Sequence, residues 1–154
     1  MIKDKIIIYT DGAARGNPGP AGWGVILFFD GKTIELGGRK DHATNNQMEL
    51  TAPTEALKYA KKHKISGAIE IFSDSKYVIL GITEWIYNWQ KNNWRNAAKK
   101  PVLNRELWEE LYKLTEELKP KWTYVEGHSG HKHNDRVDEI ATSFADDAPV
   151  KLKK

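Results

Sequence analysis

The sequence predicts one α/β domain, and three features of the chain carry that prediction. Two short apolar runs, residues 6–10 and 69–73, each lead directly to an aspartate, Asp11 and Asp74. Their β-branched and aromatic residues favour buried strands. A dipeptide typical of hairpins, Asp30–Gly31, separates two further apolar runs. Other segments carry apolar residues at helical spacing. A length of 154 residues suits a single domain with a substantial core.

Composition narrows the class of protein without identifying it. The 24 basic and 21 acidic residues give a net charge of +3, which is only weakly basic. Cysteine is absent, which excludes disulfides and thiolate metal sites. No apolar segment approaches the roughly 18 residues of a membrane span, and no signal-peptide pattern appears. We therefore expect a cytoplasmic protein with no membrane association, monomeric by default, with one domain over residues 1–146 and a flexible basic tail over 147–154.

The N-terminal third predicts a three-stranded antiparallel meander. Residues 23–29 and 32–37 read as the second and third strands, joined by the hairpin dipeptide. Residues 12–22 are dense in glycine and proline, which predicts a loop. This loop either serves only to reverse the chain or lets its backbone approach a ligand, because glycine lacks a Cβ.

A long helix is predicted over residues 44–63. Thr44 or Asn45 can cap it, and an apolar stripe follows at helical spacing. Pro53 conflicts with this prediction, because an interior proline removes one backbone hydrogen bond. A shorter helix capped by Thr51 is the alternative. We favour the longer helix with a local distortion.

The second half of the chain alternates helices and strands. After the strand at 69–73, the predicted elements are helices at 75–80, 83–90 and 105–118, a strand at 121–125, a polar loop at 127–134 and a last helix. Gly81 is expected to end the first of these helices, and Thr83 to cap the second. Asn134 is expected to cap the last helix, which carries Asp138.

The aspartates at the ends of two strands indicate a metal site. Active sites of α/β proteins lie at the carboxyl edge of the sheet. A charge next to an apolar strand is costly unless it is paired or bound to metal. Asp11 and Asp74 could each be ordinary turn residues, but their matching positions favour a shared role. Oxygen ligands alone point to Mg²⁺ or Mn²⁺ rather than zinc.

Three histidines, His128, His131 and His133, fall within six residues. The chain has neither a His-Glu-x-x-His helix nor cysteine, so a zinc site is not indicated. The histidines either belong to a structural or solvated loop, or one of them transfers protons near Asp138.

The segment from Trp85 to Arg105 contains no acidic residue and interleaves aromatic with basic side chains. Cations suit phosphates and aromatic faces suit bases, so the pattern favours nucleic-acid binding. The basic residues concerned are Lys91, Arg95, Lys99 and Lys100. The alternative places the tryptophans in the core, and we prefer it for Trp108 and Trp122.

Six motifs in order resemble type 1 ribonuclease H, from about residue 4 to residue 146. They are Tyr-Thr-Asp-Gly at 9–12, Gly-Asn-Pro-Gly-Pro at 16–20, Thr-Asn-Asn-Gln-Met-Glu-Leu at 44–50, Ser-Asp-Ser at 73–75, Gly-His-Ser-Gly-His at 127–131, and Asp138. The resemblance implies a ribonuclease H-like fold: a five-stranded mixed sheet flanked by helices, with strands 1–3 antiparallel and strands 4–5 parallel to strand 1.

The resemblance also implies roles for particular residues. The metal-binding carboxylates are Asp11, Glu49, Asp74 and Asp138, and His128 assists proton transfer or product release. Asn17, Asn45 and Asn46 contact the RNA strand. Thr44 and Asn104 hold a DNA phosphate, together with His42 where an arginine is common. Trp85 lies in the channel for the DNA strand, and residues 81–105 form a basic protrusion that binds substrate.

The expected activity is endonucleolytic hydrolysis of the RNA strand of RNA–DNA hybrids. Two Mg²⁺ ions, for which Mn²⁺ is a possible substitute, would support it and leave 5′-phosphate and 3′-hydroxyl ends with little sequence preference. The alternatives are a sister nuclease on the same fold, a hybrid-binding module without catalysis, and, more remotely, a structural protein.

Overall fold

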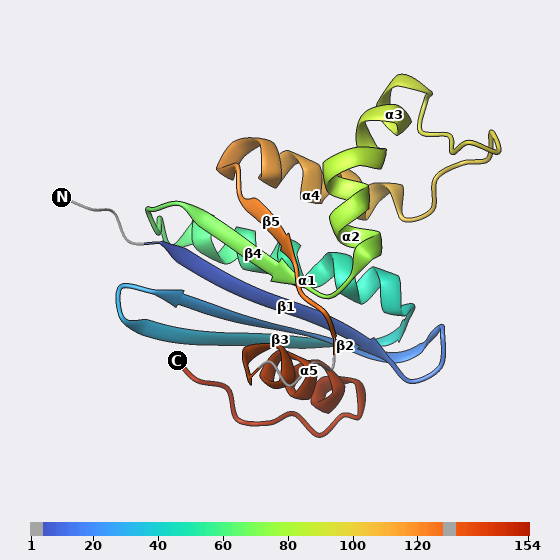
Figure 1. Ribbon diagram of the computed structural model, residues 1–154. Helices are drawn as coiled ribbons and strands as arrows, with labels where there is room; N and C mark the ends of the chain where they lie inside the picture. Colours follow the sequence, from blue (N-terminus) through green and yellow to red (C-terminus); the bar gives the residue numbers. More distant parts are fainter. Residues whose placement is uncertain (1–4, 128–131) are drawn as a thin grey trace.

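A five-stranded mixed sheet forms the centre of the molecule (Figure 1). The computed structural model describes residues 5–127 and 132–154. The strands are β1 (Ile6–Ala14), β2 (Gly19–Phe29), β3 (Lys32–Ala43), β4 (Ile69–Ser73) and β5 (Lys121–Tyr124), in the spatial order β3-β2-β1-β4-β5. β1, β2 and β3 pair antiparallel, whereas β4 pairs parallel with both β1 and β5. The predicted fold class is confirmed.

Helices cover both faces of this sheet. They are α1 (Asn45–Lys62), α2 (Lys76–Leu80), the π-helix η1 (Gly81–Trp85), α3 (Ile86–Lys91), α4 (Arg105–Leu118) and α5 (Lys132–Ala145). α1 lies against one face with α4 packed on it, and α5 lies against the other (Figure 1). Successive side chains of β1 point to opposite faces of the sheet, as in any strand. Ile8 therefore packs in the core under α1, and Tyr9 packs in the core under α5. No helix in the described ranges has the length and apolar character needed to cross a bilayer.

β1 and β2 extend further than predicted, into the run of glycine and proline. Gly12 pairs with Trp23, and Ala14 pairs with Ala21, so only residues 15–18 turn the chain. The composition of this run is typical of loops, yet long-range pairing makes it extended. Its small residues allow close packing: a Cβ on Gly24 would lie 2.8 Å from the carbonyl oxygen of Val137 in α5.

The long helix α1 is confirmed, and the shorter helix capped by Thr51 is wrong. Thr44 Oγ1 accepts a hydrogen bond from the backbone N–H of Gln47 (3.1 Å), and Gln47 Oε1 accepts one from the backbone N–H of Thr44 (2.9 Å). This reciprocal pair is a capping box. Pro53 lies inside the helix and has no N–H for the carbonyl of Glu49 four residues earlier.

α2, η1 and α3 follow one another without a break, so the predicted break at Gly81 and cap at Thr83 are wrong. Gly81 has right-handed helical dihedrals, φ −62° and ψ −48°. A Cβ there would lie 2.0 Å from Trp108, so glycine is needed for packing rather than for ending a helix. The hydroxyl of Thr83 donates to the carbonyl of Ile79 (2.5 Å) within the helical run.

The predicted cap of the last helix is also wrong, because α5 begins at Lys132 and Asn134 lies inside it. Asn134 is 3% exposed. It shares the buried side of α5 with Val137 and Ala141, three and seven residues further along. The helical stripe therefore accounts for its position.

The segment after α5 runs back along the sheet toward β3 (Figure 1). Val150 and Leu152 pack against the core under α5. The backbone N–H of Glu35 in β3 donates to the carbonyl of Lys153 (2.8 Å). The predicted flexibility of residues 147–154 stays a prediction, but the segment has specific contacts.

Candidate metal centre and nucleic-acid interface

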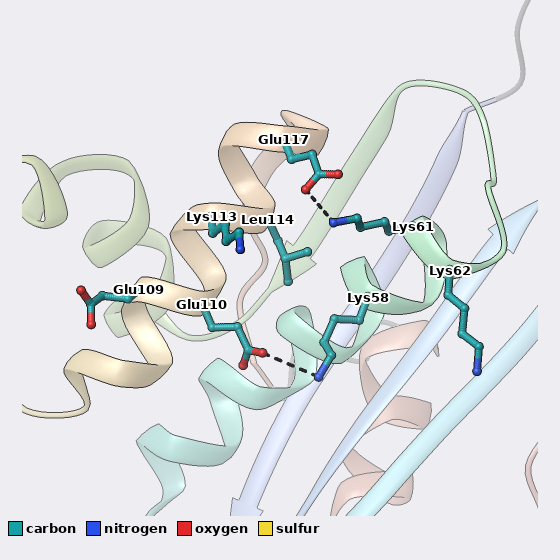
Figure 2. Close-up of a pocket in the computed structure, with 8 residues that line it drawn as sticks. All are labelled: Lys58, Lys61, Lys62, Glu109, Glu110, Lys113, Leu114 and Glu117. Carbon is teal, nitrogen blue, oxygen red and sulfur yellow. Dashed lines mark hydrogen bonds and ion pairs between the residues drawn. The ribbon is translucent and has the colours of Figure 1, made fainter.

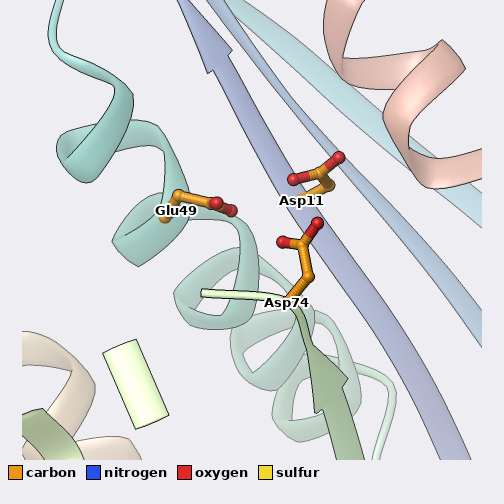
Figure 3. A group of neighbouring side chains, drawn as sticks. All are labelled: Asp11, Glu49 and Asp74. Atoms are coloured by element: carbon orange, nitrogen blue, oxygen red, sulfur yellow. The ribbon is translucent and has the colours of Figure 1, made fainter. Parts of the chain in front are cut away.

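Three carboxylates from different elements meet at one edge of the sheet (Figure 3). Asp11 lies on β1, Glu49 on α1, and Asp74 directly after β4. One oxygen of each lies within 4.8 Å of the others. The parallel register pairs Thr10 with Ser73, so the next residue of each strand is one of the two aspartates. The sequence prediction that these two strands bring their aspartates together is confirmed.

Glu49 reaches the cluster because β1 passes very close to the first turns of α1. A Cβ on Gly12 would lie 2.5 Å from the backbone nitrogen of Glu49 and 2.5 Å from the carbonyl carbon of Met48. Any side chain at position 12 would therefore push α1 away from β1. The Asp-Gly dipeptide within β1 thus combines a carboxylate of the cluster with a point of close approach to α1.

Asp138 approaches the same group from α5, on the opposite face of the sheet. Its side chain interacts with that of Asp11, where its charge adds to that of the other carboxylates. All four predicted acidic residues are thus brought to one region by β1, α1, the end of β4, and α5.

Without a bound cation, burial and mutual repulsion of the ionised carboxylates destabilise the folded protein. Asp11 is 4% exposed and Glu49 is 7% exposed. Burial is the main cause that raises the pKa of Asp11 to about 8, and the charges of Asp74 and Asp138 add to it. The backbone N–H of Gly12 donates a hydrogen bond to the carboxylate (2.9 Å), which acts in the opposite direction and lowers the pKa. Burial and the neighbouring charges of Asp11 and Asp74 likewise raise the pKa of Glu49.

The donor set suits a hard divalent cation. It consists of carboxylate oxygens, and Glu49 Oε1 is buried with no hydrogen-bond partner among the described residues. A bound cation would supply that partner and relieve the repulsion. Oxygen ligation of this kind is typical of Mg²⁺ and Mn²⁺.

The predicted RNA contacts lie where the turn between β1 and β2 meets the start of α1. Asn17 Oδ1 accepts a hydrogen bond from the backbone N–H of Asn45 (2.9 Å). The side chains of Asn45 and Asn46 are exposed at the first residues of the helix. The three asparagines thus lie together where this turn meets the start of the helix that carries Glu49.

The predicted phosphate-binding residues Thr44 and Asn104 are linked through Gln47. Gln47 binds Thr44 in the capping box, and its Nε2 donates to Asn104 Oδ1 (3.3 Å). Asn104 Nδ2 donates in turn to the hydroxyl of Tyr77 (3.2 Å). His42 is exposed on β3.

A cavity of 320 Å³ opens beside this network, and its lining includes Lys40, Gln47, Asn104 and Arg105. Sequence reasoning assigned no role to Lys40 or Gln47. The spacing Thr-x-x-Gln at 44–47 is a capping-box signal that could have drawn attention to Gln47. The position of Lys40 beside Asn104 depends on the path of β3 and had no local signal.

The basic segment forms a protrusion beyond α3 (Figure 1), and local hydrogen bonds link its residues. Arg95 bridges to Pro101 as in a short hairpin, and Asn96 Oδ1 accepts from the backbone N–H groups of Ala98 (2.9 Å) and Lys100 (3.0 Å). The side chains of Lys91, Arg95, Lys99 and Lys100 are exposed.

The tryptophans of this region divide between core and surface. Trp94 is buried, with the guanidinium of Arg105 5.1 Å from its ring centre, and Trp108 is fully buried. Trp85 remains 37% exposed beside Trp89 and Tyr77. Trp122 packs partly buried against the core. The core interpretation is therefore confirmed for Trp108, while Trp85 offers an accessible aromatic face.

Comparisons with known proteins settle the family. A family model described as RNase H matches residues 3–146. The ribonuclease H of Thermosynechococcus vestitus is 50% identical over 147 residues, which are 95% of this chain and 92% of that protein. The chain belongs to the ribonuclease H family. It is accordingly a nuclease, and the resemblance seen in its motifs is confirmed.

Solved ribonuclease H structures share its fold. LC9-RNase H1, described as a type 1 RNase H with the type 2 active-site motif, aligns with a TM-score of 0.82 at 25% identity, over 96% of this chain and 75% of the other. LC11-RNase H1, solved in complex with an RNA/DNA hybrid, aligns with a TM-score of 0.68 at 29% identity, over 93% and 98% of the two chains.

The sequence pointed to three histidines. Two of them, His128 and His131, lie outside the described residues. His133 lies in the first turn of α5, where its ring is 5.1 Å from that of Tyr9 and 4.6 Å from that of Phe28. It therefore takes part in the aromatic packing under α5.

A groove of 760 Å³ lies between α1 and α4 (Figure 2). Its lining does not include Asp11, Glu49 or Asp74. Lys58 pairs with Glu110 (3.7 Å), and Lys61 with Glu117 (2.9 Å), across the groove. Lys58 is nine residues along α1 from Glu49, about 14 Å at the helical rise. The groove therefore belongs to helix packing, where each exposed pair contributes about 0–1 kcal/mol.

Proposed function

We propose that this protein is an endonuclease that hydrolyses the RNA strand of RNA–DNA hybrids and leaves 5′-phosphate and 3′-hydroxyl ends. The observation that carries the proposal is the convergence of Asp11, Glu49 and Asp74, with Asp138 adjoining, at one sheet edge. The hybrid bound in the LC11-RNase H1 structure supports the choice of substrate. Contacts to backbones rather than base edges would give little sequence preference.

Asp11, Glu49, Asp74 and Asp138 would hold two Mg²⁺ ions, or Mn²⁺ in their place. When bound, the ions supply activation of the attacking water and stabilisation of the leaving oxygen. The protein holds these carboxylates ready, since Gly12 fixes the approach of α1 and its N–H orients the Asp11 carboxylate. His128, outside the described residues, is proposed to assist proton transfer or product release.

Discrimination between the two strands would come from the surfaces on either side of the carboxylates. Asn17, Asn45 and Asn46 would contact the RNA strand near its 2′-hydroxyl groups, the feature that distinguishes RNA from DNA. Thr44 and Asn104 would bind a phosphate of the DNA strand, with His42 nearby along β3. The exposed face of Trp85 would pack against the DNA strand.

One cleavage experiment tests the proposed activity. The same end-labelled sequence is prepared as RNA–DNA, RNA–RNA and DNA–DNA duplexes and incubated with Mg²⁺ or with EDTA. We expect cutting of the RNA strand of the hybrid alone, and only with Mg²⁺. Cutting of the DNA duplex would assign a different nuclease activity. Binding of the hybrid without cutting would identify a binding module.

The basic protrusion is expected to supply much of the affinity for substrate. Replacing Lys91, Arg95, Lys99 and Lys100 by glutamine should raise KM with little change in kcat. It should also flatten the salt dependence of binding, by about 0.7–0.9 in logarithmic slope for each phosphate that the variant leaves without a cationic partner. KM measured at several salt concentrations checks this prediction.

A matched control removes the same number of charges elsewhere. Lys62, Lys64, Lys113 and Lys119 are exposed at the end of α1 and along α4, and replacing all four by glutamine gives the same net charge. If both quadruple variants change KM and salt slope equally, overall charge rather than the protrusion governs binding.

A further inference from the structure

Glu35 is a buried carboxylate that the proposed mechanism does not use. It lies on β3 at the edge of the sheet, and its side chain is 3% exposed. Both of its oxygens are occupied: Oε2 accepts from Arg136 Nε (2.8 Å), and Oε1 accepts from Arg136 Nη2 (2.8 Å) and from the backbone N–H of Lys153 (2.9 Å). The hydrogen bonds from Arg136 hold the pKa of Glu35 below its usual range.

Arg136 joins three parts of the chain. Besides the two hydrogen bonds to Glu35, its Nη1 donates to Glu139 Oε1 (2.7 Å) and its Nη2 to the carbonyl of Lys151 (3.0 Å). The guanidinium therefore connects α5, β3 and the C-terminal segment. Two parallel hydrogen bonds between a guanidinium and a carboxylate fix orientation as well as distance.

Arg136 and Asp138 are two residues apart on α5, which places them about 200° apart around the helix. Arg136 reaches β3 on one side of α5, and Asp138 reaches Asp11 on β1 on the other. A rotation of α5 that released Arg136 would therefore move Asp138 relative to the other carboxylates.

Apolar packing also holds α5 on the sheet, because Val137 and Ile140 join Tyr9 and Ile26 in the core under this helix. Apolar packing is not directional, so the Glu35–Arg136 hydrogen bonds add an orientation that the packing does not supply. The helix lies on glycines of β2 and β3: a Cβ on Gly24 would meet Val137, and one on Gly37 would meet Phe144. Glycines permit close approach but present no side chain to interlock with the helix. At the far end of α5, Asp146 accepts two hydrogen bonds from Arg15 (2.6 and 2.8 Å), which holds that end only.

We propose that the Glu35–Arg136 pair, with the C-terminal segment docked on it, sets the rotation of α5 and thereby positions Asp138 against Asp11. Glu35 and Arg136 are positioning residues, because they act through Asp138. The inference rests on the proposed function in that Asp138 serves as a metal ligand.

A double-mutant cycle on metal binding tests this role. Mg²⁺ alone is titrated calorimetrically into the full-length protein, Glu35→Gln, Asp138→Asn and the double variant. We expect Glu35→Gln to weaken Mg²⁺ binding about tenfold, because the orientation of Asp138 is then no longer fixed by the pair. In the Asp138→Asn background it should have no further effect. For hybrid cleavage, kcat should fall while KM stays unchanged.

Additive effects in the cycle, or an unchanged Mg²⁺ affinity in Glu35→Gln, would overturn the positioning role. Wild-type protein that binds no Mg²⁺ would overturn it together with the proposed metal site, and the wild-type titration alone reveals that case. Wild-type protein that binds Mg²⁺ without cleaving the hybrid would refute the proposed activity, whereas a non-additive cycle would still support the positioning role.

A milder pair of variants covers the possibility that Glu35→Gln does not fold. Lys153→Pro removes the N–H that donates to Glu35 Oε1, and Lys153→Gln keeps it while removing the same charge. We expect weaker Mg²⁺ binding in the proline variant than in the glutamine variant. Equal affinities in these two variants would contradict a role for the docked segment.

Discussion

Replacing Asp11 by asparagine is expected to lower hybrid cleavage by about a thousandfold or more, while the fold is kept. The carboxylate lies at the centre of the cluster, where it faces Glu49, Asp74 and Asp138. Its loss removes a ligand from the proposed metal site and with it much of the stabilisation of the reaction. Initial rates with the hybrid in Mg²⁺ measure the effect, and circular dichroism confirms the fold.

The same substitution should stabilise the metal-free protein. The pKa of Asp11 is raised to about 8 in the folded state, so the folded chain binds more protons than the unfolded chain between about pH 4 and pH 8. Stability is therefore lost as pH rises through that window. At pH 8, Asp11→Asn should raise the free energy of unfolding by on the order of 2–4 kcal/mol.

Asp135→Asn provides the control, because Asp135 is exposed on α5 and carries the same charge. It should leave cleavage and the pH dependence of unfolding unchanged. Denaturant titrations in EDTA at pH 5 and pH 8 make the comparison. An Asp11→Asn variant that is no more stable than wild type at pH 8 would show that the cluster is not under strain.

Replacing Gly12 by alanine is expected to damage both stability and metal binding. The added methyl group would lie 2.5 Å from the backbone of Met48 and Glu49, so β1 and α1 must separate. Overpacking of this kind costs about 1–3 kcal/mol. The separation should also carry Glu49 away from Asp11 and weaken Mg²⁺ binding by about tenfold. Denaturant titration and Mg²⁺ calorimetry measure the two effects.

Gly31→Ala is the matched control. Gly31 has φ +70° in the hairpin, and a Cβ there meets nothing within 4 Å. The substitution carries the cost of a left-handed conformation, about 1 kcal/mol, without touching the site. We expect Gly31→Ala to lose stability but to keep its Mg²⁺ affinity. If Gly12→Ala showed the same pattern, the close approach of β1 to α1 would not be what places Glu49 in the cluster.

Local patterns predicted the elements whose signals lie within a few residues. The strands carrying Asp11 and Asp74, the hairpin between β2 and β3, and the helix with Pro53 all have such signals. The residues matched to the family motifs added Glu49 and Asp138. The structure confirms that these four carboxylates share one region, although their order in the chain says nothing about distance.

Features that depend on distant partners could not be read in this way. Gly81 resembles the end of a helix, yet the packing of Trp108 requires it within one. Asn134 resembles a cap, yet it lies on the buried side of α5. The partner of Glu35 is 101 residues away, so no periodicity or spacing could reveal the pair.

The C-terminal segment has a consequence for contacts between molecules. β3 is an outer strand of the sheet, and its unpaired backbone groups could template the addition of a strand from another copy. On β3, the backbone N–H of Glu35 donates to the carbonyl of Lys153, so the C-terminal segment already pairs with the strand at this point. The opposite outer strand, β5, is only four residues long and begins with a lysine. Both edges are thus poor starting points for aggregation, and on one of them the chain's own end provides the protection.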